Sequence, residues 1–369
     1  MSKLKRDVSA SVAVAMSGGV DSSVAAALLV EEGYRVFGVT MKLWCYAETP
    51  AASRSCCSLS AIENARSVAA RIGIPHYVVD LEDRFDKEVV RPFCLEYARG
   101  RTPNPCVVCN SEIKFKALMD RVISMGADFL ATGHYALLTE TEGGTFSLGR
   151  AADKSKDQSY VLWGIQKSRL SKIVFPLGGS RKEVVRTIAS RLELASVGAL
   201  ESQDACFVQS GSCSEFVVHR LADMGTDISP GPVVDIDGVK LGKHRGLVHF
   251  TIGQRRGLGI SSSGRRYVVA LRPESNTVVL GEKSHLLARE FVCSNLNWLN
   301  CSRCRFPLKA FVQIRYTHRP AEAIVEEIAV DRLRVRFIRE QSAITPGQSA
   351  VFYDGDYVLG GGVVEAVSR

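Results

Sequence analysis

Short apolar segments alternate with helical patterns through residues 11–135, and this alternation limits the possible folds more than any other feature of the chain. Short apolar runs predict strands, the one at Val12–Met16 being buried, and apolar residues three and four positions apart predict helices. The predicted strands are Val12–Met16, Arg35–Met41, His76–Leu81 and Asp128–Thr132, and the predicted helices are Asp21–Glu32, Ser60–Arg71, Arg84–Ala98 and Glu112–Met125. This alternation is typical of an α/β parallel sheet with helices on both faces. Ligands of such sheets bind beyond the carboxyl ends of the strands, where Ser17, Met41 and Gly133 fall.

The second half of the chain has a different pattern. From about Gly211 it is rich in glycine, valine and arginine, and its apolar runs are short. The strands predicted there are Val233–Ile236, Tyr267–Leu271, Thr277–Leu280, Lys309–Arg315, Ala323–Ile328, Leu333–Phe337 and Ser349–Tyr353. They favour antiparallel sheets folded as one or two small barrels. We therefore expect three domains in the 369 residues, at 1–210, 211–285 and 286–369.

Composition and charge limit the class of protein. Apolar residues make up 46% and charged residues 23%, as in ordinary globular proteins. No apolar run approaches the roughly 18 residues of a membrane span, and the apolar stretch after Lys3, Lys5 and Arg6 is too short for a signal peptide, so a cytoplasmic chain is expected. The net charge of +8 permits a polyanionic partner. Eleven cysteines, an odd number in a chain of this length, favour cysteine chemistry or metal binding over a disulfide scaffold.

A glycine-containing turn, Ser17–Ser23, joins the first predicted strand to the first helix. Its two glycines allow a tight turn that directs several backbone N–H groups into one concavity, and the helix N-terminus adds partial positive charge. Asp21 and Ser22 are predicted to cap the helix or to approach a Mg²⁺ ion bound to phosphate. The turn could simply be a capped strand-to-helix connection. The full seven-residue string after a buried strand favours a nucleotide site.

Other phosphate-binding motifs are absent from the sequence. There is no G-x-x-x-x-G-K-[ST], and no G-x-G-x-x-G opens a helix after a strand. Ser17–Ser23 instead resembles the loop of the pyrophosphate-loop family of ATP enzymes, whose domain has the adenine nucleotide alpha-hydrolase-like fold. That resemblance implies cleavage of ATP between its α and β phosphates and adenylation of a substrate oxygen. The family includes small-molecule amidotransferases as well as tRNA sulfur transferases.

Two cysteines, Cys106 and Cys109, occur in a proline-containing stretch at residues 100–110. The prolines predict a rigid loop between two helices, with both cysteines at its tip. A thiol near a helix N-terminus, with Lys114 nearby, is expected to have a depressed pKa. A structural zinc half-site is the alternative, but the other C-x-x-C, Cys301 and Cys304, begins 192 positions after Cys109. Those two cysteines, and the adjacent pair Cys56 and Cys57, receive no role.

Several longer motifs resemble the bacterial tRNA-specific 2-thiouridylase family, and they cover nearly the whole chain. They are Ser17–Ser23, Met41-Lys42, Thr102–Phe115, Ala131–Tyr135, Lys156–Tyr160, Cys206-Phe207, Gly253–Gly259, Ile314–Tyr316, Thr345–Ala350 and Leu359–Gly362. The resemblance implies an enzyme that replaces oxygen by sulfur at C2 of the wobble uridine of certain tRNAs. On its local sequence alone, Cys206 would be interpreted as a buried cysteine without a role. The resemblance instead implies that Cys206 takes part in the reaction.

The resemblance assigns roles position by position. It implies ATP binding by Ala15, Met16, Ser17, Gly18, Gly19, Val20, Asp21, Ser22, Met41 and Gly133. It implies that Cys109 is the catalytic cysteine, that Cys206 receives sulfur as a persulfide, and that the target base lies against Asn104, Pro105 and Cys106. It implies tRNA contacts by His134, Lys156, Asp157, Gln158, Arg315, Tyr316 and Gln348.

Two chemical routes follow from these roles. In the first, a persulfide on Cys206 attacks an adenylated C2 and Cys109 resolves it, which leaves a Cys109–Cys206 disulfide to be reduced. The second arises because many relatives have aspartate where this chain has Cys106. Three thiolates at Cys106, Cys109 and Cys206 could hold a 4Fe–4S cluster with one iron open to sulfide. ATP and Mg²⁺ serve both routes, and a sulfur-donor protein, a cysteine desulfurase or a relay, is the expected partner besides tRNA.

Two alternative functions remain open at this point. A small-molecule ligase with the same loop would release AMP without tRNA, but it gives no reason for the paired cysteines. An RNA-binding or sulfur-carrier module without catalysis would not need an intact Ser17–Ser23 loop.

Overall fold

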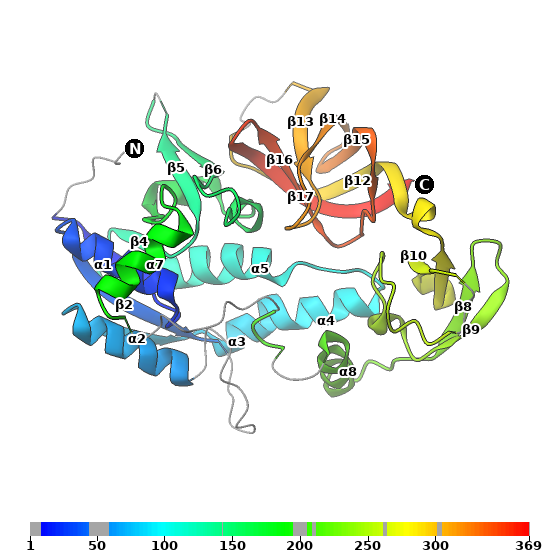
Figure 1. The fold of residues 1–369 in the computed structure, drawn as a ribbon, viewed down its shortest axis with the longest axis horizontal. Helices are drawn as coiled ribbons and strands as arrows, with labels where there is room; N and C mark the ends of the chain where they lie inside the picture. The colour runs from blue at the N-terminus through cyan, green and yellow to red at the C-terminus, as the bar shows by residue number, and fades with distance from the viewer. Residues whose placement is uncertain are drawn as a thin grey trace. The chain divides into compact units, whose positions relative to one another are not determined.

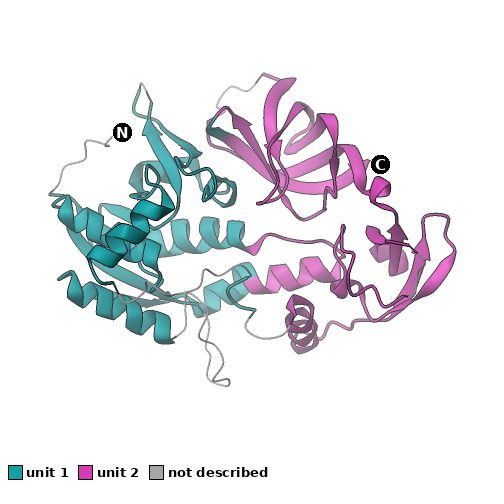
Figure 2. Ribbon diagram, viewed as in Figure 1, with its two compact units in different colours: residues 1–89, 106–210, 356–358 teal, residues 90–105, 211–355, 359–369 magenta. Residues whose placement is uncertain are grey.

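The protein is described by a computed structural model covering residues 9–43, 59–141, 143–194, 205–208, 212–260, 264–300 and 305–368. The chain divides into two compact units, which Figure 2 shows in different colours. Unit 1 holds residues 1–89, 106–210 and 356–358, and unit 2 holds residues 90–105, 211–355 and 359–369. Cys56, Cys57, Cys301 and Cys304 lie outside the described residues.

A parallel sheet forms the centre of unit 1, as the strand–helix alternation predicts. Five strands in the described part of the chain lie in the order β3-β2-β1-β4-β7, and every neighbouring pair is parallel. Their bounds are β1 Ser11–Ala15, β2 Arg35–Lys42, β3 His76–Asp80, β4 Phe129–Thr132 and β7 Ile173–Val174. The first four match the predicted strands to within one residue at each end. The α/β fold class is therefore confirmed.

Three helices pack on this sheet through small and branched apolar side chains. They are α1 Val20–Glu31, α2 Leu59–Arg71 and α7 Lys182–Arg191, and Figure 1 shows them gathered around the strands. One buried cluster joins the sheet to its helices. In it, Val12 and Val14 of β1, with Met16 directly after the strand, pack against Val24 and Val185. Burial of these side chains fixes the carboxyl end of β1, and with it the turn that follows, on the side of the sheet where the parallel strands end.

The cysteine-bearing stretch differs from its prediction. Instead of a loop up to residue 110, a helix begins at Pro105 and runs through α5 Pro105–Val108, a π-helical segment Cys109–Leu118 and α6 Met119–Ser124. Cys106 and Cys109 therefore lie in the first turns of the helix and not at a loop tip. The reason is that proline suits the first helical position, where its missing N–H would have no intrahelical partner. Asn110 is buried and donates from Nδ2 to the Val161 carbonyl at 2.9 Å, which ties this helix to a later segment of the chain.

The preceding helix also contains a π-helical segment. It runs through α3 Glu82–Phe85, a π segment Asp86–Val90 and α4 Arg91–Ala98, close to the predicted Arg84–Ala98. Pro92 lies at the start of α4. Because proline lacks an N–H and its ring crowds the carbonyl four residues earlier, the helix widens just before it.

A hairpin and several short helical turns complete unit 1. The sequence did not predict the hairpin β5 Ala136–Glu140 and β6 Phe146–Arg150, whose strands are antiparallel. The short turns are at Ser159–Val161 and Lys167–Lys172. Gly149 of β6 pairs with Tyr357, at the start of the last strand of the chain.

Unit 2 begins, after α4, with a helix that the sequence analysis missed. This is α8 Cys213–Asp223, and it has a capping box in which Ser212 and Glu215 exchange hydrogen bonds between side chain and backbone. Ser-x-x-Glu before an apolar run is the signal that would have found it. A small sheet follows, in the order β10-β11-β8-β9 among the described residues. Its strands are β8 Gly231–Asp235, β9 Lys240–His244, β10 Tyr267–Arg272 and β11 Thr277–Gly281, and short helical turns lie at Leu247–His249, Pro273–Ser275 and Lys283–Leu286.

This small sheet corrects one expectation. The pairing of β11 with β8 is parallel, whereas a wholly antiparallel sheet was predicted. The chain makes a long excursion between β9 and β10, and β11 returns beside β8 in the same direction. Residues such as Leu247 and Phe250 of the excursion are buried in the core of this sheet.

The C-terminal strands form a closed barrel, as the sequence predicts. In the described residues, β12-β15-β14-β13-β16-β17 are hydrogen-bonded in turn, and β12 also pairs with β17, which closes the ring. The strands are β12 Leu287–Trp298, β13 Leu308–Gln313, β14 Ala321–Ala329, β15 Arg332–Ser342, β16 Ser349–Asp354 and β17 Tyr357–Ser368. Inward-facing Phe291, Val335, Phe337 and Phe352 fill the interior. Closure gives both β12 and β17 a partner on each side of the ring.

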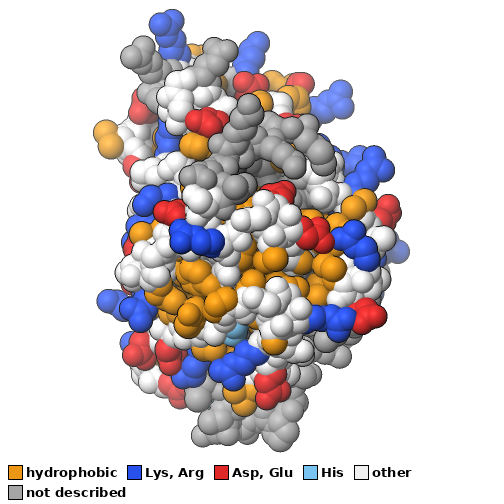
Figure 3. Space-filling view, turned by 90° about the vertical axis from the view of Figure 1, so that its left-hand side faces the viewer, with side chains coloured by type: hydrophobic (Ala, Val, Ile, Leu, Met, Phe, Trp, Pro, Cys, Tyr) orange, Lys and Arg blue, Asp and Glu red, His pale blue; other side chains and the backbone are white. Residues whose placement is uncertain are grey.

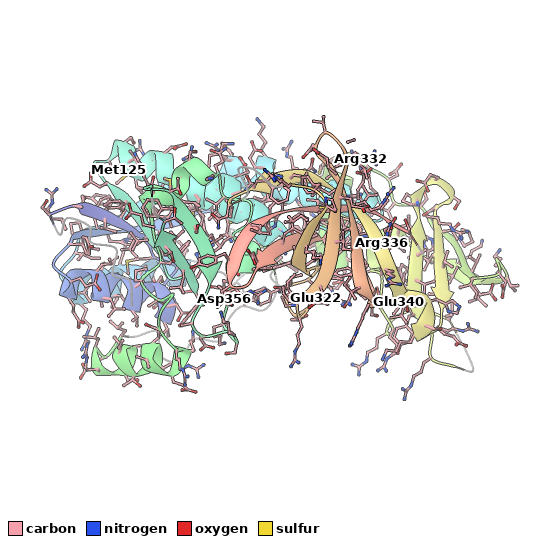
Figure 4. All side chains as sticks on the ribbon, turned by 90° about the horizontal axis from the view of Figure 1, so that it is seen from above. Met125, Glu322, Arg332, Arg336, Glu340 and Asp356 are labelled. Atoms are coloured by element: carbon pink, nitrogen blue, oxygen red, sulfur yellow. The ribbon has the colours of Figure 1, made fainter. Side chains whose placement is uncertain are left out.

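Two arginines on the barrel surface form ion pairs with carboxylates of other barrel strands. Figure 4 labels Arg332 and Arg336 on β15. Arg332 Nη2 lies 2.7 Å from Glu365 Oε1, and Arg336 Nε lies 3.2 Å from Glu290 Oε2. The charges of these two arginines are therefore balanced locally by carboxylates.

One side of unit 1 carries exposed apolar side chains, which Figure 3 shows gathered together. At the starts of strands β1–β3, Arg35, Phe37, Pro75, Tyr77 and Met125 help to line a cavity of about 400 Å³. These are the amino ends of the parallel strands, opposite to the ends followed by Ser17 and Gly133. In the described residues, no helix is long and apolar enough to span a membrane.

Candidate active site

The turn after β1 is organised around the hydroxyl of Ser22. The Ser17 amide donates to Ser22 Oγ at 3.1 Å, and Ser22 Oγ donates to the Gly19 carbonyl at 3.1 Å. Gly19 is the N-cap residue of α1, and no side chain caps the helix there. The predicted capping by Asp21 or Ser22 is therefore not present. Backbone N–H groups at such a helix start form a site for an anion.

Two glycines allow a close approach of backbone segments at this turn. Gly18 has φ +70°, and a Cβ there would lie 2.5 Å from the Ala61 carbonyl oxygen of α2. A Cβ on Gly133, just after β4, would lie 2.7 Å from the Ser22 nitrogen. Gly19, in contrast, would place its Cβ only against Ser17 Oγ at 3.4 Å. The fold thus brings the Ser17–Ser22 turn and Gly133 together as a compact backbone cradle that could hold an anion.

A row of hydrogen bonds behind the turn holds the end of β1. Thr40 Oγ1 donates to the Met16 carbonyl at 2.8 Å, and His76 Nε2 lies 2.8 Å from the same hydroxyl oxygen. Because the Thr40 proton is already used, His76 Nε2 is the donor. Burial, with a smaller effect from Arg66, lowers the pKa of His76 and favours this neutral form.

A partly buried ion pair at the start of α1 was missed by the sequence analysis. Lys182 Nζ donates to both Asp21 carboxylate oxygens at 2.8 Å, and the Tyr135 hydroxyl donates to Asp21 Oδ1 at 2.8 Å. The Lys182 side chain is 10% exposed and that of Asp21 is 31% exposed. Lys182 and Asp21 are 161 positions apart, so no local pattern reveals the pair.

We expect Lys182→Met to destabilise the fold by about 2 kcal/mol, because it removes two charge-assisted hydrogen bonds from the partly buried Asp21 carboxylate. Arg191→Met is the matched control on the same helix, since Arg191 pairs with Glu31 at 2.9 Å but is 61% exposed. It should cost less than about 1 kcal/mol. Urea denaturation of both variants measures the difference. Equal losses would contradict a special role for this pair.

His134 lies in a cluster of rings beside the cradle. Its ring centroid is 5.9 Å from that of Phe115 and 6.0 Å from that of Phe175, and its Nδ1 lies 2.7 Å from Thr132 Oγ1. Desolvation, with a smaller effect from Lys114, lowers the pKa of His134 well below its ordinary value. The imidazole is therefore neutral at neutral pH and suits stacking or hydrogen bonding, not ion pairing with a phosphate.

This neutral histidine predicts a loss of stability in acid. With a folded pKa below the unfolded value of about 6.5, the unfolded chain binds more protons, and stability falls as pH decreases below that value by up to about 1.4 kcal/mol per pH unit. We expect His134→Gln to reduce this slope between pH 6.5 and 5, whereas His219→Gln, at a side chain that is 81% exposed, leaves it unchanged. Denaturation curves at several pH values provide the measurement. The same slope in both variants would exclude His134 as the cause.

The three cysteines of interest have different surroundings. Cys106 is exposed, Cys109 is buried and Cys206 is half-buried. Phe207, next to Cys206, packs edge-on against Phe85 at 5.8 Å between ring centroids. In the described ranges, which include all three cysteines, no group of three His, Cys, Asp or Glu side chains is placed to hold a metal ion. The arrangement in this structure does not fit a three-cysteine cluster site.

Two of the three predicted tRNA contacts at 156–158 have structural roles. Asp157 accepts hydrogen bonds from the Ser159 amide at 3.2 Å and from its hydroxyl at 2.8 Å. Gln158 Oε1 accepts from the Tyr135 amide at 2.9 Å. These contacts fix the segment that carries Lys156, which is half-buried. Lys156 is therefore the most suitable of the three to contact a phosphate.

The other predicted tRNA contacts belong to unit 2. Arg315 donates from Nη2 to the Ser342 carbonyl at 3.1 Å, and the neighbouring Tyr316 is 47% exposed. Gln348 donates from Nε2 to the Thr102 carbonyl at 2.8 Å. Tyr316 thus offers an accessible ring for stacking on a base or ribose, while the Gln348 amide is bonded to the protein itself.

Three family models match consecutive parts of the chain. They are described as a tRNA methyl transferase HUP domain at residues 10–210, a tRNA methyl transferase PRC-barrel domain at residues 215–282 and an aminomethyltransferase beta-barrel domain at residues 288–364. Among solved structures, the U34-tRNA thiolase NcsA from Methanococcus maripaludis with its 4Fe-4S cluster is similar over 60% of this chain and 69% of its own, at 21% identity and a TM-score of 0.36. Similarity at this level supports no conclusion about ligands.

Curated relatives match along almost their whole length. The tRNA-specific 2-thiouridylase MnmA of Acetivibrio thermocellus is 43% identical over 96% of this chain and 99% of its own. The protein of the same name from Carboxydothermus hydrogenoformans is 45% identical over 96% of this chain and 97% of its own. The chain therefore belongs to the tRNA-specific 2-thiouridylase family.

Proposed function

We propose that this protein is an ATP-dependent sulfurtransferase that makes 2-thiouridine at the wobble uridine of tRNA. The observation that carries the proposal is the backbone cradle of Ser17–Ser22 and Gly133. It occurs in a chain that matches almost the whole length of relatives named as tRNA-specific 2-thiouridylases. The cradle suits a nucleoside triphosphate, and Lys182 and Asp21 hold the first turn of α1 in place. ATP, with Mg²⁺, is the substrate that this site would take.

Adenylation solves the chemical difficulty of the reaction. The C2 carbonyl of uracil is a poor electrophile and its oxygen is a poor leaving group. Attack of that oxygen on the α-phosphorus of ATP releases pyrophosphate and makes the oxygen part of AMP, which departs when sulfur adds to C2. The cradle residues Ser17–Ser22 would bind the phosphates, and Met41, at the end of β2, would lie beside the nucleoside. The uridine must leave the anticodon stack to reach the site.

Sulfur delivery is assigned to Cys206 and Cys109. In the persulfide route, the terminal sulfur on Cys206 forms a bond to C2 and AMP leaves. The Cys109 thiolate then attacks Cys206 Sγ, which breaks the sulfur–sulfur bond, leaves a thiocarbonyl on the base and forms a disulfide. External thiols supply the two electrons that reduce it. A sulfur-donor protein recharges Cys206, whose half-buried position keeps it within reach of a partner.

The tRNA would be held through both units of the chain. Lys156 suits a phosphate, neutral His134 suits a base or ribose, and exposed Tyr316 suits stacking beside Arg315. Asn104, Pro105 and Cys106 would line the target base. The segments 1–210, 211–285 and 286–369 would then serve as the catalytic domain, the central tRNA-contact domain and the C-terminal barrel.

Anaerobic thiolation of unmodified tRNA tests the proposal. The protein is assayed as purified and after iron removal, with ATP and a sulfur donor, and 2-thiouridine is measured by nucleoside mass spectrometry. Activity of the iron-free protein, together with activity of Cys106→Asp, supports the persulfide route. Activity confined to iron-loaded protein, and lost in Cys106→Asp, assigns all three cysteines as cluster ligands. Absence of 2-thiouridine in both preparations, with AMP released when tRNA is omitted, would favour a small-molecule ligase instead.

A further inference from the structure

A turn of the C-terminal barrel is bonded to the chain just after α4. This turn, Thr345–Gln348, connects β15 to β16. The Thr102 amide donates to the Pro346 carbonyl at 2.9 Å, and Gln348 Nε2 donates to the Thr102 carbonyl at 2.8 Å. Both backbone hydrogen-bonding groups of Thr102 are therefore held by one turn, and all these residues belong to unit 2.

Gly347 brings the two backbones into direct contact. Its φ is +92°, and a Cβ there would lie 2.9 Å from the Thr102 nitrogen and 3.1 Å from its carbonyl oxygen. The turn itself is fixed to β17, because the Gly347 amide donates to the Val364 carbonyl at 2.9 Å and the Val364 amide donates to the Gln348 carbonyl at 2.8 Å. The barrel thus presents a rigid surface to Thr102, with no space for a side chain at position 347.

The residue before Thr102 is held by the same strand. Arg101 donates from Nη2 to the Val364 carbonyl at 3.1 Å and from Nη1 to the Glu365 carbonyl at 3.2 Å. Its Nε lies 2.6 Å from Glu96 Oε2, so the carboxylate balances the guanidinium charge. Two successive residues are consequently fixed to the barrel, and the chain reaches Asn104 only two residues later.

We propose that Gln348 is a positioning residue for the Asn104–Cys106 segment and acts through Thr102. The inference rests on the proposed function, since it takes that segment as the one that receives the target base. It replaces the role in direct tRNA contact that the sequence resemblance implied for Gln348. The energetic logic is that a segment held in advance loses less conformational freedom when the base arrives.

Gln348→Met tests this assignment, because methionine is close to glutamine in size but has no donor for the Thr102 carbonyl. We expect the kcat for 2-thiouridine formation to fall about 10-fold with the dissociation constant for tRNA changed by less than about 2-fold. Hydrogen exchange in the peptide that contains residues 99–106 should become faster. Gln341→Met is the matched control, because Gln341 is bonded within the barrel to the Arg339 carbonyl and to His318. It should change none of these quantities.

A double-mutant cycle with Gly347→Ala adds a second measure. Alanine at 347 displaces Thr102 directly, so its effect on kcat and that of Gln348→Met should be less than additive. A weaker tRNA affinity with unchanged kcat and unchanged exchange would overturn the proposal and restore direct contact. Unchanged kcat, affinity and exchange would also overturn it. If the wild-type protein makes no 2-thiouridine, the proposed function fails, while the exchange measurement still decides whether Gln348 holds Thr102.

Discussion

Gly18→Ala is expected to weaken ATP binding about 100-fold and to reduce 2-thiouridine formation at least as much. At φ +70° an alanine is strained by about 1 kcal/mol, and its Cβ would lie 2.5 Å from the Ala61 carbonyl oxygen. Both backbone segments at that contact are fixed: the sheet holds the turn at Gly18, and Ala61 is part of α2. The turn would have to move, and its N–H groups would no longer converge on one anion. Calorimetric titration with a non-hydrolysable ATP analogue measures the loss.

Gly73→Ala is the control that separates strain from displacement. Gly73 lies just after α2 with φ +72°, almost the same angle, but a Cβ there would meet no atom beyond its chain neighbours within 4 Å. It should lower stability by about 1 kcal/mol and leave ATP affinity unchanged. Gly19→Ala tests a neighbouring position in the same turn where little displacement is expected, because a Cβ there would meet only Ser17 Oγ. If Gly18→Ala binds the analogue as well as Gly73→Ala does, the cradle is not the phosphate site.

The parallel sheet could be predicted because its evidence is local. Each strand of unit 1 up to β4 contains a short apolar run, and the turn at Ser17–Ser23 is contiguous in sequence. The barrel was also predicted, although its long strands β12 and β17 were not, and neither was β9 of the small sheet. In β12 and β17, bulges and glycines interrupt the alternation of polar and apolar residues that marks a strand. The register shifts between these two strands show the interruptions.

The parts of the site that depend on tertiary contacts could not be predicted. Nothing near Lys182 distinguishes it from the other lysines of the chain, and its partner Asp21 belongs to a motif in which a capping role was the local expectation. Gln348 likewise matches a family motif, but its hydrogen bond to Thr102 joins residues 246 positions apart. Pro105 is a different case. It was a local signal for a helix start that was interpreted as a loop, and this error placed Cys106 and Cys109 outside the helix.

Cys109→Ser should abolish 2-thiouridine formation, with a loss of at least about 1000-fold, because serine can neither resolve a persulfide nor bind iron as a thiolate. ATP affinity should remain, since Cys109 is not part of the Ser17–Ser22 cradle. Cys94→Ser is the matched control: Cys94 is also buried, in α4, and its replacement introduces the same buried hydroxyl. Both variants should lose similar stability, about 1–3 kcal/mol, but only Cys109→Ser should lose activity.

The state of Cys206 in the Cys109→Ser variant then distinguishes the sulfur routes. In the persulfide route, Cys206 of this variant still accepts sulfur, so mass spectrometry after incubation with the donor should find a peptide heavier by one sulfur atom. AMP should form no faster than in the wild type, because no turnover follows. In the cluster route, the variant instead loses bound iron and carries no persulfide. Wild-type levels of 2-thiouridine from Cys109→Ser would contradict both routes and would remove Cys109 from the catalytic machinery.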